Sequence, residues 1–121
     1  MRQVPALNQN ETTVLAETFR LLGDPTRLRI LLFCLAGQKS VGYIAESLGL
    51  SQTLVSHHLR LLRGAKLVVS ERHAKQVFYQ IADGHMSDML IAMADHISKD
   101  QYEKVTTGPH SMPSASSSTG Q

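Results

Sequence analysis

SVGYIAESLGLSQTLVSHHLRLLRG, residues 40–64, is the stretch that decides the fold. Ser40 is placed to cap a short helix that stops at Gly49, and Ser51 to cap a longer helix that stops at Gly64. The apolar positions predicted to face inward are Val41, Ile44, Ala45 and Leu48, followed by Leu54, Val55, Leu59 and Leu62. A short helix, a tight turn containing glycine and a longer helix together predict a helix-turn-helix.

Two further helices are predicted before this motif. The first begins at a cap on Asn10 and closes at Gly23, with apolar residues at helical spacing between them. Asp24 followed by Pro25 then restarts the chain, because proline suits the first position of a helix. The second helix is predicted to run up to Gly37, and its leucine stripe makes it central to the core.

After the motif the periodicity changes. KLVVSERHAKQVFYQI, residues 66–81, is predicted to form two strands around a polar tip at residues 71–75. Its inward positions are predicted to be Leu67, Val69, Val77, Tyr79 and Ile81. A hairpin that follows the second helix of a helix-turn-helix is called a wing. The fold class expected is therefore mainly α with a small β-hairpin, a winged helix-turn-helix.

ADGHMSDMLIAMADHISKD, residues 82–100, predicts a last helix with Asp83 as its cap. Its apolar stripe consists of Met86, Leu90, Met93 and Ile97. The Ser-, Gly- and Pro-rich residues 105–121 cannot bury enough apolar surface to fold and are predicted to be a disordered tail. Residues 1–9 are predicted to be loose, which leaves residues 10–104 as the domain.

Composition restricts the class of protein. A chain of 121 residues makes one small domain, for which a second copy is a plausible source of further buried surface. It has no apolar run long enough to span a bilayer and no secretory signal, so we expect a cytoplasmic protein with no membrane contact. The single cysteine, Cys34, excludes an intramolecular disulfide and is expected in the core.

The net charge is only +2, but its distribution is uneven. Residues 51–75 are basic, whereas residues 83–103 are acidic. In a helix-turn-helix the second helix enters the major groove, and side chains from its first turns reach the base edges. The side chains predicted to contact DNA are Ser51, Gln52, Thr53, Ser56, His57 and Arg60, with Arg72 and Lys75 of the wing on phosphate or minor groove. The alternative is a polar helix face that is merely solvated.

Three segments together resemble the ArsR/SmtB family of bacterial winged-helix repressors. They are LGDPTRLRILLFCL (22–35), SQTLVSHHLRLLRGAKLV (51–68) and VFYQI (77–81), and the likeness extends from about Thr12 to Lys99. The resemblance implies a homodimer, paired through its first and last helices, that binds an operator palindrome in double-stranded DNA. It also implies release from DNA when an inducer, commonly a metal ion, is bound.

The last helix carries two histidines, His85 and His96, eleven residues apart. Eleven residues of α-helix bring both onto one face but separate them by a rise of about 16 Å, so they cannot share one ion within a chain. Antiparallel pairing of two such helices across a two-fold axis would set Asp83 and His85 of one subunit beside His96 of the partner subunit. Two equivalent sites per dimer would result.

The resemblance implies the same ligand set. The zinc-sensing branch of the family carries D-x-H near the start of this helix and H-x-x-H or H-x-x-E near its end, which Asp83, His85 and His96 match. The fourth position is Lys99, a poor ligand, so Asp100 is the favoured substitute, with His110 and water as the other candidates. Oxygen and imidazole ligands favour zinc, with cobalt or nickel as alternatives.

The metal interpretation has a structural alternative. Asp83 can be explained as a helix cap, His96 by its position near a helix C-terminus, and His85 by exposure. The family also implies a link from the metal-bound histidine to a backbone carbonyl near Lys66, just after the recognition helix. Its other known site, paired cysteines on the third helix, is excluded because SVGYIAE (40–46) contains none.

Other functions remain open at this point. A winged-helix regulator that answers a non-metal signal, or none, is the main alternative, and Lys99 supports it. A winged helix that binds only proteins is disfavoured by the polar recognition face and the basic wing. An enzyme is the weakest alternative, because no nucleophile, base and orienting group converge in the sequence.

Overall fold

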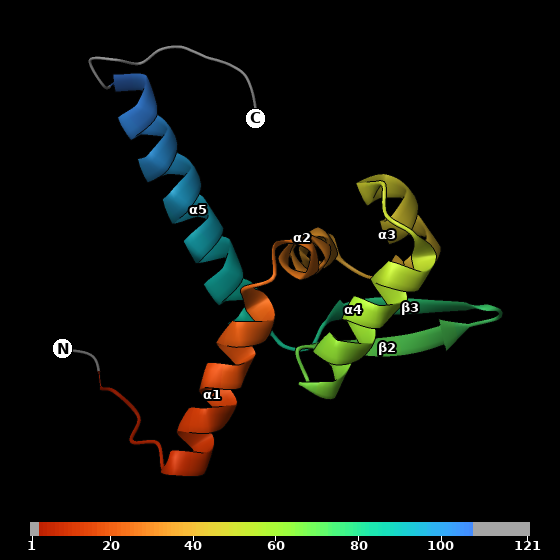
Figure 1. The fold of residues 1–121 in the computed structure, drawn as a ribbon, viewed down its shortest axis with the longest axis horizontal. Coiled ribbons are helices and arrows are strands. Elements are labelled where there is room, and N and C mark those ends of the chain that lie inside the picture. Colours follow the sequence, from red (N-terminus) through yellow and green to blue (C-terminus); the bar gives the residue numbers. More distant parts are fainter. Residues whose placement is uncertain (1–2, 108–121) are drawn as a thin grey trace. The chain divides into compact units, whose positions relative to one another are not determined.

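A computed structural model of the chain describes the backbone of residues 3–107 and the side chains of residues 3–99. Within these residues lie five α-helices, a short 3₁₀ helix and a three-stranded sheet (Figure 1). The chain divides into two compact units, one up to Met86 and the other from Ser87 onward. The described elements agree with the predicted mainly α fold carrying a small hairpin.

Helix α1 spans Gln9–Leu22 and is capped by Asn8, not by Asn10 as predicted. The side chain of Asn8 accepts the backbone N–H of Glu11 at 2.8 Å, and the Glu11 carboxylate accepts the N–H of Asn8 at 3.0 Å. This reciprocal pair is a capping box, and it requires an acid three residues after the cap. Only Asn8 has Glu11 at that spacing, which explains the error of two residues.

Helix α2 spans Pro25–Phe33, and its predicted cap is confirmed. The Asp24 carboxylate accepts the backbone N–H of Arg27 at 2.8 Å, and this hydrogen bond holds the pKa of Asp24 below its usual range. The last part of the predicted helix is tighter than expected, because Cys34–Ala36 forms the 3₁₀ helix η1. The chain then turns at Gly37, whose φ of 139° favours glycine.

The helix-turn-helix forms as predicted at its beginning and at its turn. Helix α3 spans Val41–Leu48 and α4 spans Gln52–Gly64, with Ser40 and Ser51 as their caps. Each serine hydroxyl accepts a backbone N–H at 3.1 Å from the residue three positions further on. Gly49 ends α3 in the left-handed conformation, with φ 70° and ψ 36°.

The predicted end of α4 at Gly64 is confirmed. The left-handed residue that follows the helix is not a glycine but Lys66, with a φ of 63°. The N–H of Lys66 donates to the carbonyl of Arg63, and the N–H of Leu67 donates to that of Leu62, both at 2.9 Å. These two hydrogen bonds form a Schellman motif with lysine at the position that glycine usually takes.

The wing is a three-stranded antiparallel sheet in the order β1-β3-β2. Strands β2 (Val68–His73) and β3 (Gln76–Ile81) form the predicted hairpin, and their turn includes Ala74 at a φ of 57°. Strand β1 (Lys39–Ser40) was not predicted, and it pairs with Phe78 and Tyr79 of β3. A strand of two residues is too short for an alternating pattern.

Burial in β2 is shifted by one residue from the prediction. Val68 is buried and pairs with Ile81 of β3, whereas Val69 is 44% exposed. Leu67 is also buried, but it belongs to the exit from α4, not to the strand. Because a one-residue change in register turns each side chain to the opposite face, the predicted inward position of Val69 is wrong.

The core of the first unit lies between α2, α3, α4 and the base of the wing. Its buried apolar residues are Leu21, Leu22, Ile30, Leu31, Cys34, Ile44, Ala45, Val55, Leu59, Leu62, Leu67, Val68 and Tyr79. Cys34 is among them, as predicted, and burial raises the pKa of its thiol to about 11. Leu54 is 38% exposed and not inward as predicted, whereas His58 is buried in its place.

Helix α5 spans Gly84–Thr107. Asp83 caps it as predicted, since its carboxylate accepts the N–H of Met86 at 3.0 Å. The helix continues three residues into the segment predicted as a tail, and residues 108–121 lie outside the described residues. None of the helices described for residues 3–107 combines the length and the hydropathy that a membrane span requires.

Candidate nucleic-acid interface and metal-binding residues

The first turns of α4 present a polar surface. Of the six residues predicted there, five are exposed and Ser56 is half-buried; the exposed ones are Ser51, Gln52, Thr53, His57 and Arg60. The opposite side of the helix is held in the core by Val55, Leu59 and Leu62, each of them fully buried. The helix is therefore fixed from behind, and its hydrogen-bonding side chains are available to a ligand.

Gln52, the first residue of α4, lies beside α3. Its side-chain nitrogen Nε2 is 3.6 Å from the position that a Cβ atom would occupy on Gly42. The absence of a side chain at Gly42 thus leaves room for this amide close to the start of α3. The two helices of the motif present one combined edge, with Gln52 at the point where they meet.

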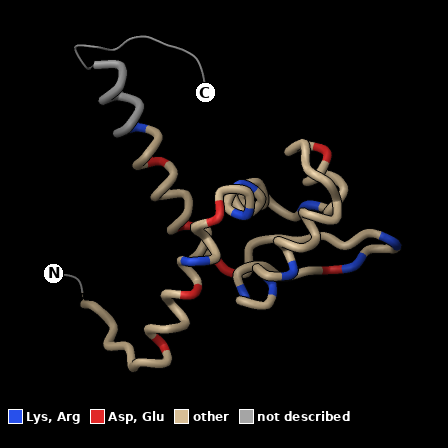
Figure 2. The backbone as a smooth tube through the Cα atoms, viewed as in Figure 1, with Lys and Arg blue, Asp and Glu red and all other residues tan. Residues whose placement is uncertain are grey.

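The wing carries positive charge at its tip. Arg72 and Lys75 are exposed, and Figure 2 marks Lys and Arg positions in blue along the backbone at the end of the hairpin. Between them His73 contacts Phe78 edge to face, with ring centroids 5.2 Å apart. Its Nε2 lies 3.5 Å from the carboxylate of Glu71, so an acid stands next to the two bases.

A buried polar residue that the sequence analysis did not single out is His58. It is only 7% exposed, and its Nδ1 accepts a hydrogen bond from the Nε–H of Arg27 at 3.2 Å. Burial, followed by the positive charge of Arg27, lowers the pKa of this histidine. Its neighbour His57 is exposed on the polar face, so adjacent histidines of α4 lie in opposite environments.

Two of the three predicted metal ligands lie near each other. The Nδ1 of His85 is 3.9 Å from the Oδ1 of Asp83, and both side chains are exposed. His96 is exposed too, further along α5. The ammonium of Lys99, at the position where the family pattern has a ligand, lies 3.6 Å from the carboxylate of Asp95.

No three His, Cys, Asp or Glu side chains gather into a metal site in the part of one chain that is described. The side chains of Asp100 and His110, the two predicted substitutes for a fourth ligand, lie outside the described residues. The chemistry of Asp83 and His85, one carboxylate and one imidazole, fits a divalent ion of the zinc type. Two protein ligands are too few to hold such an ion, so further ligands would have to join Asp83 and His85.

Lys66, predicted as a coupling residue, lies at the exit from α4. It is exposed and borders a shallow, open groove of about 450 Å³. The groove is lined by Arg63, Lys66, Val68, Val69, Ser70 and Ala82. The guanidinium of Arg63 donates to the hydroxyl of Ser70 at 3.3 Å, which ties the end of α4 to β2.

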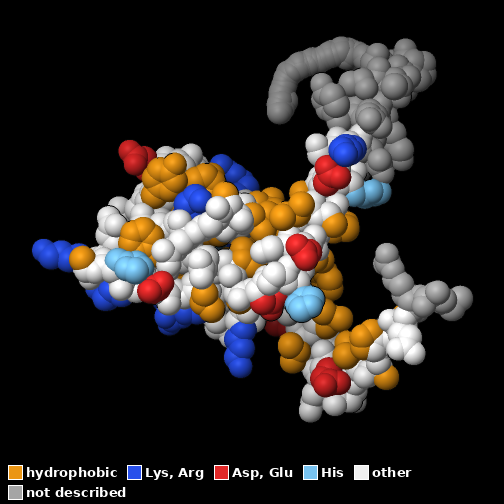
Figure 3. All heavy atoms as spheres, turned by 180° about the vertical axis from the view of Figure 1, so that it is seen from behind, with side chains coloured by type: hydrophobic (Ala, Val, Ile, Leu, Met, Phe, Trp, Pro, Cys, Tyr) orange, Lys and Arg blue, Asp and Glu red, His pale blue; other side chains and the backbone are white. Residues whose placement is uncertain are grey.

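Both α1 and α5 expose large apolar side chains, visible on each helix in Figure 3. On α1 these are Val14, Leu15 and Phe19, which are 66%, 45% and 57% exposed. On α5 they are Ile91, Met93 and Ile97, each half exposed or more. Of the predicted apolar stripe on α5, Leu90 is buried, whereas Met93 and Ile97 are not.

Comparison with known proteins agrees with this geometry. The model of the family described as "Bacterial regulatory protein, arsR family" matches residues 24–70, which run from the cap of α2 into β2. A "Transcriptional repressor SmtB homolog" from Synechocystis is 33% identical over 95 residues, 78% of this chain and 72% of that protein. The "HTH-type transcriptional regulator CmtR" of Mycobacterium tuberculosis is 45% identical over 78 residues, 64% of this chain and 66% of its own length.

A solved structure from Mycobacterium bovis, described as a homodimeric winged helix-turn-helix DNA-binding domain, has a TM-score of 0.66. It is 23% identical and covers 83% of this chain and 94% of its own, a likeness that confirms the winged helix-turn-helix fold. The family resemblance expected from the sequence is likewise confirmed by the relatives. The chain therefore belongs to the ArsR family of bacterial regulatory proteins and is a DNA-binding transcriptional regulator, not an enzyme.

Proposed function

We propose that the protein is a cytoplasmic transcriptional repressor that binds an operator palindrome as a homodimer and leaves it when a divalent metal ion binds. The observation that carries the DNA part is the α4 surface, where a row of exposed polar side chains stands on a helix anchored by a buried opposite face. A rigid helix of this kind can enter the major groove without reorganising the core. Gln52 is suited to adenine, and Arg60 to guanine or phosphate.

The wing extends the proposed DNA surface. Arg72 and Lys75 stand at its exposed tip, where they can contact phosphates or enter the minor groove. Each phosphate contact releases condensed counterions, so affinity is expected to fall steeply with salt. Positioning by the wing and base contacts by α4 are separable roles, and this makes the proposal testable one residue at a time.

The proposed dimer rests on the exposed apolar residues of the first and last helices. Phe19, Met93 and Ile97 each leave half or more of their surface in solvent in a single chain. Covering such side chains with a second copy would stabilise both chains by about 25 cal/mol for each Å² of apolar surface removed from water. A two-fold dimer also matches the symmetry of a palindromic operator.

The proposed metal site uses Asp83 and His85 of one subunit with His96 of the partner subunit. Asp83 and His85 are exposed and lie near each other, so both side chains are accessible to an ion and to a ligand from a second subunit. Lys99 argued against the site from the sequence, but Asp95 offsets its charge in the structure. Asp100 or His110 remains the proposed fourth ligand, and zinc the proposed ion, with cobalt or nickel as alternatives. The bound ion would join the two last helices and favour a dimer that cannot span both half-sites.

Binding of DNA is tested with a duplex selected by the protein itself from a random-sequence library. Gln52→Ala is expected to weaken binding to that duplex by about 5- to 150-fold and to relax preference at one base pair. Lys75→Ala should weaken binding to all duplexes alike and reduce the salt slope by about one. Gln80→Ala, an exposed glutamine on β3, is the matched control and should change neither quantity. A Gln52→Ala protein with unchanged affinity and preference would contradict the proposed reading of bases by α4.

The metal is tested on the complex with the same duplex. Zn²⁺, Co²⁺ and Ni²⁺ are titrated in turn, and release of DNA is followed by fluorescence anisotropy. His85→Gln and His96→Gln should keep the affinity of the metal-free protein yet lose the release by metal. Lys99→Ala is the control, since it removes a neighbouring charge but no proposed ligand, and it should still respond.

A second function has support from the sequence. Lys99 stands at the position where the family pattern has a fourth ligand. A winged-helix regulator that responds to a non-metal signal, or to none, would need no ligand at that position. If none of the three ions changes DNA affinity, this alternative replaces the metal-responsive repressor.

A further inference from the structure

A partly buried hydrogen bond joins the start of α2 to the middle of the recognition helix α4. The Nε–H of Arg27 donates to the Nδ1 of His58 at 3.2 Å, across 31 positions of sequence. His58 is 7% exposed, and its neighbours Val55, Leu59 and Leu62 are fully buried. The contact is therefore part of the interface between α2 and α4 and fixes the recognition helix at one defined point.

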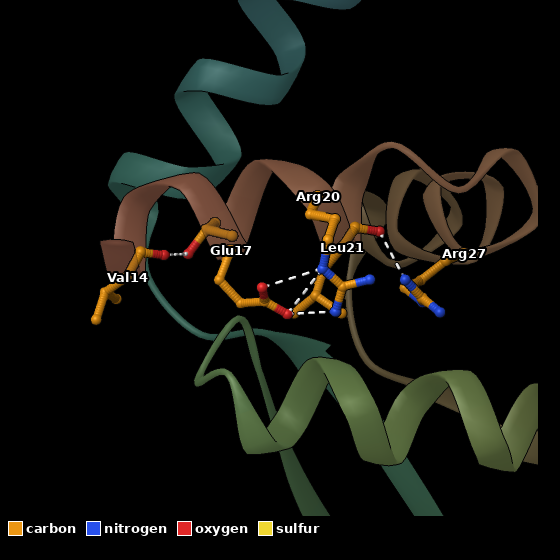
Figure 4. A network of polar contacts seen from close by, with 6 residues as sticks. Val14, Glu17, Arg20, Leu21 and Arg27 are labelled. Atoms are coloured by element: carbon orange, nitrogen blue, oxygen red, sulfur yellow. Dashed lines mark hydrogen bonds and ion pairs between the residues drawn. The ribbon is translucent and has the colours of Figure 1, made fainter. Parts of the chain in front are cut away.

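The donor side of this contact is itself held in place. The Nη1–H of Arg27 donates to the carbonyl of Leu21 at 3.0 Å, the contact drawn in Figure 4. The backbone N–H of the same arginine donates to Asp24 at 2.8 Å, at the cap of α2. Because Arg27 is held at its backbone N–H and at Nη1 independently of His58, a rearrangement of the contact is expected to move His58 more than Arg27.

The direction of the hydrogen bond defines the proton state of His58. An imidazole nitrogen that accepts from a guanidinium carries no proton, so His58 is neutral here with its proton on Nε2. A second proton would put N–H against N–H and a positive charge against the guanidinium in a buried place. The protonated histidine can therefore not keep this contact.

The charged and titratable groups that face His58 come from the start of α2 and from α4. Arg27 opposes its protonation, as does His57, whose ring centroid is 5.6 Å from that of His58. Asp24 favours protonation, but its carboxylate already accepts the N–H of Arg27. Burial and Arg27 outweigh Asp24, so the pKa of His58 lies below its ordinary value of 6.5.

We propose that the Arg27–His58 contact positions the recognition helix and that uptake of a proton by His58 releases it, which lowers the affinity of the protein for its operator in acid. His58 is a positioning residue in this proposal, since it is buried and acts through the placement of α4. Its exposed neighbour His57 belongs to the proposed DNA surface, so a small movement of α4 at His58 is passed directly to a side chain at the groove. Operator affinity would then report pH as well as any inducer.

The sign of the effect follows from the lowered pKa. Above about pH 6.5 His58 is neutral, the contact is formed, and its contribution to stability and to the placement of α4 is complete. That contribution is lost as pH falls through the pKa of His58 in the folded protein. A comparison of variants is needed to isolate the contribution of His58 from the charge of the DNA-binding surface as a whole.

The test compares wild-type protein with His58→Asn and His57→Asn. Asparagine places an amide oxygen near the position of Nδ1, so His58→Asn keeps an acceptor for Arg27 but cannot take up a proton. Affinity for the library-selected duplex is measured by anisotropy between pH 8 and pH 5 at constant ionic strength. Relative to His58→Asn, wild-type affinity should fall by up to about tenfold for each pH unit below the pKa of His58. His57→Asn should retain this fall.

Equal pH profiles for wild type and His58→Asn would overturn the proposal. If His58→Asn does not fold, NMR titration of the wild-type imidazole decides in its place. The proposal expects His58 as the Nε2–H tautomer, with a pKa lower in the DNA-bound protein than in the free one, and an equal pKa in both would overturn it. The inference rests on the proposed DNA binding. If no duplex can be selected at pH 8, the proposed function itself is contradicted, whereas a selected duplex with equal pH profiles contradicts only the role of His58.

Discussion

Replacing Lys66 by glycine should make the protein more stable. Lys66 holds a φ of 63° at the end of α4, where two hydrogen bonds of 2.9 Å fix the turn into β2. A residue with a side chain costs about 1–2 kcal/mol in the left-handed region, whereas glycine enters it freely. Glycine also gives the unfolded chain more freedom, which offsets about 0.5–1 kcal/mol. The net expectation for Lys66→Gly is a stabilisation of about 0.5–1 kcal/mol.

The measurement is urea unfolding followed by circular dichroism, with Lys66→Ala as the matched control. Alanine removes the same charge and the same stem but keeps a Cβ atom, so it retains the backbone strain. Lys66→Gly should have the higher midpoint of the two, and thermal unfolding should shift upward by about 2–6 °C. If Lys66→Gly is no more stable than Lys66→Ala, the left-handed conformation of this residue does not cost the folded protein the free energy argued above. If Lys66→Gly is more stable and also changes the release of DNA by metal, the backbone at Lys66 takes part in linking metal binding to DNA release.

Two further predictions concern the core. Leu62→Ala, at a fully buried position on α4, should destabilise the protein by about 2–5 kcal/mol in the same urea assay, whereas Leu61→Ala, at a position 38% exposed, should change it by about 1 kcal/mol or less. Similar losses for both would mean that the two leucines are not divided between core and surface as described. The Cys34 thiol, 1% exposed and with a pKa raised to about 11, should react with a disulfide reagent at pH 8 only when denaturant is added. Rapid reaction of the folded protein would contradict its burial.

Signals within a few residues of each other predicted most of the helices. Asp24 before Pro25, Ser40 and Ser51 each cap the expected helix, because the hydrogen bond they accept comes from three residues ahead. The capping box on Asn8 belongs to the same class, because Glu11 stands three residues after Asn8, whereas Asn10 has no acid at that spacing. Where the determining contact is local, the sequence alone is therefore sufficient.

The predictions from sequence fail where contacts between residues far apart in the sequence determine the structure. Leu54 was predicted to face inward but is 38% exposed, and the buried residue is His58, which accepts a hydrogen bond from Arg27, 31 positions away in the sequence. Val68 faces inward because of its pairing with Ile81, which no pattern within β2 reveals. The end of α4 at Gly64 agrees with the prediction, but no local pattern indicates that Lys66, two residues later, takes the left-handed conformation.

The candidate site divides in the same way. The polar face of α4 follows from helical periodicity, so its residues could be named from sequence, and the structure leaves five of the six exposed. Asp83 and His85 are neighbours in sequence and lie close in the structure. The remainder of the proposed metal site depends on a second chain, and neither the periodicity nor the described part of one chain can supply it.

The third strand of the wing has a consequence for folding. A two-stranded hairpin has only marginal stability by itself in water. The hairpin of β2 and β3 acquires its third strand only when Lys39 of β1 pairs with Tyr79 of β3, forty residues later in the chain. The intervening segment contains both helices of the DNA-binding motif, so closing the loop requires the motif to be in place. In native-state hydrogen exchange, the amides of β3 and of α4 should consequently open together as one cooperative unit, with the wing unable to melt and re-form by itself.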